Sequence, residues 1–188
     1  MSLRQVWAAA QRSLEGEFVM SFASIAYPAD KAERYDLMIA QIRALTDGIT
    51  HPIANLANTA ALLWQGMPGI NWCGFYLMDE GALMLGPFCG LPACIRIPLG
   101  RGVCGTAAQK DEIQRVHDVH DFPGHIACDS ASNSEIVIPI HFGGRVIGVL
   151  DIDSPMIGRF DETDQEKLME IVQLLEIGCD FSHTGYTL

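Results

Sequence analysis

The chain has 188 residues, of which 49% are apolar and 19% are charged, and its formal net charge at pH 7 is −11. This length and apolar content predict one globular domain with an adequate core and exclude extended disorder. The 12 Lys and Arg residues do not offset the 23 Asp and Glu residues, so the basic face that a nucleic-acid partner requires is not expected. No uninterrupted apolar stretch approaches the roughly 20 residues that cross a bilayer, so we expect no membrane partner either.

Residues 1–33 are expected to form a leader ahead of the domain. Residues 1–14 contain Arg4, Arg12, several apolar side chains and no acid. This composition is typical of a mitochondrial transit segment, and equally of an ordinary N-terminal helix that docks on the domain. We favour the docking helix and a cytoplasmic location, and the mitochondrial alternative stays open.

Two amphipathic helices are expected next. Apolar residues recur at helical spacing from Met38 to Ile49, and the first helix should end near Gly48. The pattern returns after Pro52, which suits the first turn of a second helix, and it is broken at Gly66.

From residue 70 the sequence changes to short β-rich segments. Residues 70–78 and 82–88 flank an Asp-Glu-Gly sequence, a pattern that predicts a β-hairpin. A third strand is expected at residues 94–98, followed by a short helix that ends near Gln109.

The remaining elements are a strand, a long loop, a hairpin and a helix. The strand is expected at residues 113–117, and residues 117–133 are polar and aperiodic, as in functional or disordered loops. The last helix carries one apolar stripe, formed by Leu168, Ile171, Val172, Leu175 and Cys179. This order of elements predicts an α+β fold, in which helices pack on one side of a central antiparallel sheet.

The hairpin before the last helix raises a question of strand register. Ile136, Ile138, Ile140 and Phe142 alternate in its first strand, as do Val146, Leu150 and Ile152 in its second. For both sets to face one core, paired residues must have numbers of equal parity, which a two-residue Gly143-Gly144 loop alone does not give. We therefore expect a bulged turn near residues 142–145, with positive φ angles at the glycines.

This register would gather three carboxylates. Asp151 and Asp153 leave the same face of one strand, and Glu135 joins them if the pairing has equal parity. We expect the three to line one pocket, with Trp72 or Tyr76 opposite. The alternative is a solvent-exposed acidic face, which is common in antiparallel sheets.

Five of the six cysteines fall into two groups. An even number suggests a disulfide framework, but such frameworks are typical of short secreted chains. Cys73 and Cys179 fit small buried hydrophobic residues. Cys94, Cys104 and Cys128 lie beside glycine-containing or polar segments and are candidates for a nucleophile, which forms a sulfenic acid, and a thiol that resolves it to a disulfide.

Two of these thiols have surroundings that could activate them. Cys104 follows a loop that leads into a helix, so backbone N–H groups and Arg101 are expected to lower its pKa. Cys128 lies in the long polar loop beside His125 and Asp129.

A zinc site is the main alternative for the same loop. His117, His120, His125 and Cys128 lie within one short stretch, and imidazole with thiolate is a plausible zinc ligand set. No Cys-x-x-Cys accompanies them, and their spacing matches no recurrent zinc module. We therefore predict no metal.

Six segments together resemble the free methionine-R-sulfoxide reductases, a family built on the GAF domain. They are residues 71–76 (NWCGFY), 92–97 (PACIRI), 100–106 (GRGVCGT), 122–129 (FPGHIACD), 134–137 (SEIV) and 148–153 (GVLDID). The three cysteines in this order and context are the specific part of the resemblance. It implies a single GAF domain at residues 34–183, followed by a short tail at residues 184–188.

The resemblance also implies an activity. The expected protein is a homodimeric enzyme without a bound cofactor, which reduces free L-methionine-R-sulfoxide and is recycled by a thioredoxin-type reductant. It implies that Cys128 is the nucleophile and that Cys94 or Cys104 resolves the sulfenic acid. Because most GAF domains are non-enzymatic ligand sensors, a small-ligand sensor is the alternative function.

The resemblance further implies the substrate-binding residues. The positions of Glu135, Asp151 and Asp153 would bind the substrate and assist protonation, and Trp72 and Tyr76 would surround its S-methyl group. The chain departs from the family pattern by two extra thiols, Cys73 and Cys89. Cys89 lies close to Cys94 in the sequence, so it could be an alternative resolver or a glutathione-accessible thiol.

Overall fold

Six strands form one antiparallel sheet in the order β5-β4-β3-β8-β7-β6. The structure is a computed structural model that describes residues 10–12, 18–20, 26–124 and 130–183. The strands are β3 (Trp72–Asp79), β4 (Ala82–Gly90), β5 (Arg96–Pro98), β6 (Gln114–Val116), β7 (Ser134–Phe142) and β8 (Arg145–Ser154). The two long hairpins, β3–β4 and β7–β8, meet in the middle of the sheet, where β3 pairs with β8.

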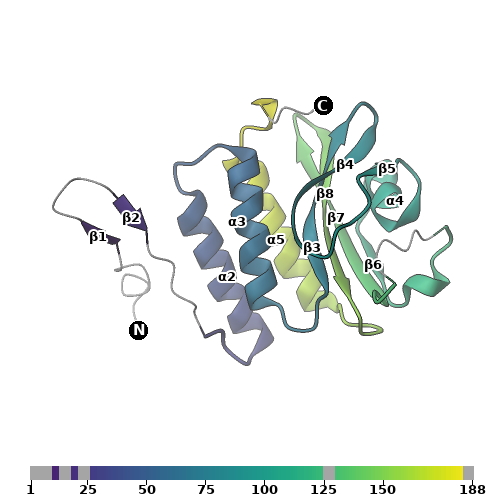
Figure 1. Cartoon of the computed structure of the whole chain (residues 1–188), viewed down its shortest axis with the longest axis horizontal. Helices are drawn as coiled ribbons and strands as arrows, with labels where there is room; N and C mark the ends of the chain where they lie inside the picture. Colours follow the sequence, from purple (N-terminus) through teal and green to yellow (C-terminus); the bar gives the residue numbers. More distant parts are fainter. Residues whose placement is uncertain (1–9, 13–17, 21–25, 125–129, 184–188) are drawn as a thin grey trace.

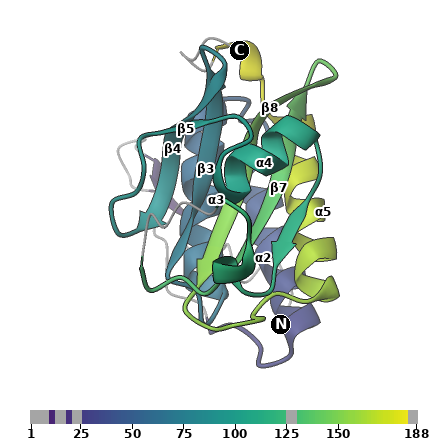
Figure 2. The same ribbon diagram turned by 90° about the vertical axis from the view of Figure 1, so that its right-hand side faces the viewer.

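Helices cover both faces of the sheet. Three pack on one face (Figure 1): α2 (Lys31–Thr46), α3 (Pro52–Gly66) and α5 (Glu162–Gly178). The shorter α4 (Gly102–Lys110) lies across the other face (Figure 2). The α+β prediction is confirmed, and α4 is the short helix expected to end near Gln109. Unlike the other three helices it packs on the opposite face of the sheet, where its apolar side chains form a second small core. Two 3₁₀ turns complete the described part of the domain, η1 (Val119–Asp121) and η2 (Phe181–His183).

The described residues within the first 20 positions of the leader are not helical. Strands β1 (Ala10–Arg12) and β2 (Phe18–Met20) pair with each other antiparallel, so the predicted N-terminal helix is wrong for these residues. Pairing of the two short segments satisfies backbone groups that an isolated helix of this length would hold only marginally. Among the described helices, none combines the length and the apolar character needed to cross a membrane.

The β7–β8 hairpin contains the expected bulge, at a different place. Phe142 pairs with Arg145 across a two-residue turn, in which Gly143 and Gly144 have φ angles of 60° and 74°. Positive φ at both positions gives the tight turn that matches the twist of the strands. The extra residue is therefore inserted in β8, where the register shifts at Ile147 between the pairs Ile140–Gly148 and His141–Val146.

The bulge decides which face each side chain takes. Beyond it, paired residues have equal parity, and Ile147 faces the helices together with Leu150 and Ile152. Val146 lies on the opposite face, against the core under α4. The prediction that Val146 shares a face with Leu150 is therefore wrong, because the bulge lies between them.

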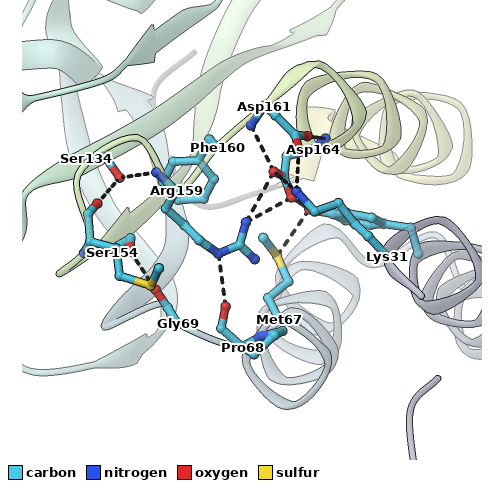
Figure 3. A network of polar contacts seen from close by, with 12 residues as sticks. Lys31, Met67, Pro68, Gly69, Ser134, Ser154, Arg159, Phe160, Asp161 and Asp164 are labelled. Atoms are coloured by element: carbon cyan, nitrogen blue, oxygen red, sulfur yellow. Dashed lines mark hydrogen bonds and ion pairs between the residues drawn. The ribbon is translucent and has the colours of Figure 1, made fainter. Parts of the chain in front are cut away.

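A buried carboxylate ties the helices to one end of the sheet. Asp164 of α5 is fully buried and accepts a hydrogen bond from the hydroxyl of Tyr35 at 2.8 Å. Its carboxylate also accepts hydrogen bonds from Lys31 Nζ at 2.7 Å and from Arg159 Nη1 at 3.2 Å (Figure 3). Arg159 in turn donates to the carbonyl of Pro68, and its backbone N–H donates to Ser134 Oγ at the start of β7. This network fixes the end of the sheet next to the acidic residues of β7 and β8.

Tyr35→Phe tests the strength of this network. The variant loses a hydrogen bond to a buried carboxylate, so we expect the free energy of unfolding to fall by about 1.5–3 kcal/mol. Urea denaturation measures the change. The matched control is Tyr27→Phe, which removes a hydroxyl that donates to the neutral Gln41 amide at 2.9 Å and should lower the free energy of unfolding by about 0.5–1.5 kcal/mol. Equal losses in both variants would contradict a special role for Asp164.

Candidate active site

A pocket opens on the α4 face of the sheet. Its cavity volume is about 40 Å³, and it is partly open to solvent. Strands β3, β7 and β8 form its floor, and the start of α4 and the segment before β5 form its sides. It is lined by Trp72, Tyr76, Pro92, Ala93, Ile97, Arg101, Gly102, Val103, Cys104, Ser132, Glu135, Asp151 and Asp153.

The register of the sheet brings the three acids together. Glu135 pairs with Asp153, and Asp153 pairs with Trp72 on its other side. Asp151 lies one step along the same face of β8, and all three carboxylates line the pocket, as the register argument predicts. Trp72 and Tyr76 also line it, but from the neighbouring strand of the same sheet, so the expectation that they lie opposite is wrong.

The aromatic side of the pocket is a stack of three rings. The Trp72 ring lies between Tyr76 and Phe88, with centroid distances of 5.8 and 5.4 Å, and its Nε1–H donates to the carbonyl of Leu91 at 3.1 Å. Gly74 makes this arrangement possible. A Cβ at Gly74 would lie 2.3 Å from Phe88 Cβ and 2.7 Å from Trp72 Cη2, closer than real contacts allow.

Cys104 faces the acids rather than a cation. The residue is third in α4 and 4% exposed, and its thiol donates to Glu135 Oε1 at 3.7 Å. Burial raises the pKa of Cys104 well above its ordinary value, and the neighbouring Asp151 and Glu135 raise it further. The predicted lowering of this pKa by the helix N-terminus and Arg101 is therefore wrong, because desolvation and the carboxylates outweigh them.

The two acids nearest Cys104 favour their protonated forms. Burial raises the pKa of Glu135 well above its usual range, and the nearby Asp151 and Asp153 add to the rise. Burial also raises the pKa of Asp151, to about 6. Asp151 Oδ1 is buried and has no hydrogen-bond partner among the residues that the structure describes, so it can accept a proton or a donor from a ligand.

The structure describes only part of the histidine set that was the alternative zinc site. Of that set, the described members are His117, whose carbonyl accepts from the Gly158 N–H, and His120, whose ring contacts Asp118. His125 and Cys128 lie outside the described residues. Within the described part of the chain, the group with metal-ligand geometry is Cys104, Glu135 and Asp151, whose ligand atoms lie within 4.8 Å of one another. The three groups can also lie this close together without a metal ion, because their pKa values are raised and protons can bridge them.

The cysteines occur in two chemical states. Cys94 follows the pocket residue Ala93 and is held in a disulfide. Four others are free thiols: Cys73, Cys89, Cys104 and Cys179. Cys73 and Cys179 are buried, as expected of small hydrophobic residues.

Ser132 is a polar pocket residue that the sequence analysis did not predict. Ser132 is 5% exposed, lines the pocket, and its Oγ accepts from Asn71 Nδ2 at 3.0 Å. Its only signal in the sequence is its place in the long polar loop, where many residues are equally polar.

Comparison with known proteins places the chain in a family. Residues 42–178 match the GAF domain family. A protein of Escherichia coli named free methionine-R-sulfoxide reductase is 52% identical over 147 residues, which cover 78% of this chain and 89% of that protein. A protein of the same name from Saccharomyces cerevisiae is 41% identical over 160 residues, which cover 81% of this chain and 89% of that protein.

A solved structure agrees with these relatives. The free methionine-R-sulfoxide reductase of Neisseria meningitidis, in complex with its substrate, matches with a TM-score of 0.80 and 46% identity, over 86% of this chain and 96% of that chain. The chain belongs to the free methionine-R-sulfoxide reductase family. Within this family the chain keeps a GAF fold whose pocket combines a thiol, three acids and an aromatic stack.

In this family member, Asp151→Asn should change the pH dependence of stability. The pKa of Asp151 is raised in the fold, so its contribution is fully present below the unfolded pKa near 4 and is lost as pH rises through about 6. The free energy of unfolding of the variant, relative to wild type, should therefore rise between pH 4 and pH 8 by roughly 1–3 kcal/mol. Urea denaturation at both pH values measures it.

The exposed Asp47→Asn controls for the same chemical change outside the pocket. A difference between Asp151→Asn and wild type that does not vary with pH would show that Asp151 ionises as freely in the fold as in the unfolded chain.

Proposed function

We propose that the protein reduces free L-methionine-R-sulfoxide to methionine, through a cysteine sulfenic acid and an intramolecular disulfide. The observation that carries the proposal is the buried cluster of Cys104, Glu135 and Asp151 beside the aromatic stack. A sulfoxide oxygen leaves only after it is protonated, and this cluster contains Glu135, a carboxyl group whose pKa is raised well above its usual range by burial. The named relatives favour this enzyme over the alternative of a non-enzymatic GAF sensor.

Substrate binding follows from the two sides of the pocket. The α-ammonium group of a free amino acid pairs with Asp153 and with the unpartnered Oδ1 of Asp151. The S-methyl group packs against Trp72 and Tyr76. Methionine sulfoxide within a protein has no α-ammonium group, so the acids select the free amino acid.

The chemical step requires one nucleophile and one acid. The Cys128 thiolate attacks the sulfoxide sulfur, and Glu135, whose pKa is raised, donates a proton to the sulfoxide oxygen. The hydroxyl group then moves from the substrate sulfur to Cys128 Sγ, as the original S–O bond and the newly formed S–S bond both break. Methionine leaves as the reduced thioether, and Cys128 is left as a sulfenic acid. A second thiol then attacks Cys128 Sγ, water leaves, and a disulfide forms.

Cys94 is the better candidate for this second thiol. Cys94 is held in a disulfide, whereas Cys104 is a free thiol within the acid cluster. We propose Cys128 as the partner of Cys94, since the four other cysteines are free. Cys104 then serves as a neighbour that shares its proton with Glu135.

The remaining parts of the cycle are proposed from the family resemblance. A thioredoxin-type dithiol reduces the disulfide, no cofactor stays bound, and the active protein is a homodimer. We place it in the cytoplasm, where such a reductant is present.

A coupled assay tests the function. Thioredoxin, its reductase and NADPH are supplied with free R-sulfoxide, free S-sulfoxide or a dabsylated methionine sulfoxide. NADPH consumption is expected with the free R-sulfoxide alone, and Cys128→Ser should abolish it without loss of fold. Equal rates with the dabsylated substrate would contradict the role of the acids, and tight binding without turnover would identify a sensor.

Cys94→Ser separates reduction from recycling. A single turnover without reductant should release about one methionine per subunit, and the reaction with thioredoxin should then stall because no disulfide can form. Rapid quench followed by amino-acid analysis measures the burst. Cys179→Ser, which alters a buried thiol on the helix side, is the control with normal recycling. Normal recycling by Cys94→Ser would transfer the resolving role to Cys104 or Cys89.

Asp153→Asn should weaken substrate binding. An amide pairs less strongly with an ammonium group than a carboxylate does, so KM for the free R-sulfoxide should rise on the order of 10-fold, which corresponds to about 1.4 kcal/mol. Steady-state kinetics measure KM and kcat. Asp121→Asn, at an exposed acid outside the pocket lining, is the control. An unchanged KM for Asp153→Asn would place the ammonium group elsewhere.

A further inference from the structure

Two thiols outside the active site face each other across the β3–β4 hairpin. Cys73 of β3 and Cys89 of β4 are direct cross-strand partners, and both are free. Directly opposed residues of antiparallel strands have Cα atoms about 4.5–5.5 Å apart and side chains on the same face. Disulfides span Cα separations of about 4.4–6.8 Å, so the backbone already has the spacing that a bond between these thiols needs.

The sheet separates this pair from the catalytic thiols. Cys73 and Cys89 pack in the core under α2, α3 and α5. Cys94 and Cys104 pack on the other face, under α4. Cys89 is therefore poorly placed to resolve a sulfenic acid in the pocket, although only five positions separate it from Cys94, and its nearest redox partner is Cys73.

The two thiols also differ in access. Cys73 has no exposed surface, whereas Cys89 is only partly buried. An oxidant in solvent therefore meets Cys89 first, and Cys73 is held next to it as an internal reductant. Burial raises the pKa of both thiols, so the reaction is slower than at an activated catalytic cysteine.

We propose that Cys73 and Cys89 are a second, non-catalytic redox pair, which closes to a cross-strand disulfide when a hydroperoxide oxidises Cys89. The Cys89 thiolate attacks the terminal peroxide oxygen, the O–O bond breaks, and Cys89 becomes a sulfenic acid while water or an alcohol leaves. Cys73 then attacks Cys89 Sγ, the S–O bond breaks, and the hydroxide takes up the Cys73 proton as water. Two thiols are oxidised by two electrons, and the peroxide is reduced.

The disulfide would lie directly behind the aromatic side of the pocket. Trp72 and Phe88 are the residues that precede Cys73 and Cys89, and their rings stack on the opposite face at 5.4 Å. The bond would join covalently the two strands that carry these rings. Oxidation of the pair by an oxidant in solvent would therefore cross-link the part of the sheet that carries the aromatic side of the pocket.

The experiment removes the proposed catalytic thiols, so its result does not depend on the proposed function. A variant with Cys94→Ser, Cys104→Ser and Cys128→Ser keeps three of the six cysteines. After treatment with hydrogen peroxide and denaturation, thiol titration should fall from three to one per chain. Digestion after Glu80, which lies between the two cysteines, should give a reducible pair of linked peptides that contain Cys73 and Cys89.

The matched control adds Cys89→Ser to the same background. Its two remaining thiols, Cys73 and Cys179, should stay titratable after the same treatment. If the triple variant does not fold, the digestion of peroxide-treated wild type reports the same linked peptides. Three titratable thiols after treatment, or Cys89 oxidised while Cys73 remains free to alkylate, would overturn the proposal.

Discussion

One inserted residue, Ile147, determines how the domain is built. Without its bulge, the two-residue glycine turn would pair odd with even positions, and the apolar side chains of β7 and β8 would face opposite sides of the sheet. The same register places Glu135 beside Asp153 and Asp151. The core under the three helices and the acidic pocket under α4 are therefore two results of a single alignment, so a shift in one would destroy the other.

The acidic pocket in turn depends on desolvation. Glu135, Asp151 and Cys104 are buried together, and burial raises the pKa of all three. The nearby acids raise the pKa of Glu135 and Cys104 further, so the protonated forms of these two groups are favoured most. In the mechanism that we propose, Glu135 of this cluster supplies the proton that the sulfoxide oxygen takes up. The burial of acids, which is unfavourable for folding, would serve that chemical step.

The sequence was informative where a local rule applies, and less so where distant segments meet. Apolar spacing predicted α2, α3, α5 and both hairpins, because helix and strand periods are local. Parity arguments predicted the shared face of Glu135, Asp151 and Asp153 but put the bulge in the turn, since they count residues without locating the extra one. The pKa of Cys104 was predicted in the wrong direction, because the flanking sequence shows a helix start and an arginine but not the acids from β7 and β8 that face it. Ser132 and the side of the sheet that α4 covers depend on tertiary packing, which no single segment encodes.

Gly74 has a consequence for how the specificity of this pocket would evolve and be mapped. Phe88 Cβ and Trp72 Cη2 lie 2.3 and 2.7 Å from the place that a Cβ of Gly74 would occupy, so both side chains pack there only because the residue is glycine. Among point substitutions, the addition of one methyl group there would lift the ring and narrow the space for the thioether. Alanine scanning measures the effect of removing side-chain atoms. At Gly74 the substitution by alanine removes none and instead adds a methyl group. A loss of activity on substitution of Gly74 would thus be recorded as an overpacking defect, although the position supports the aromatic side of the pocket.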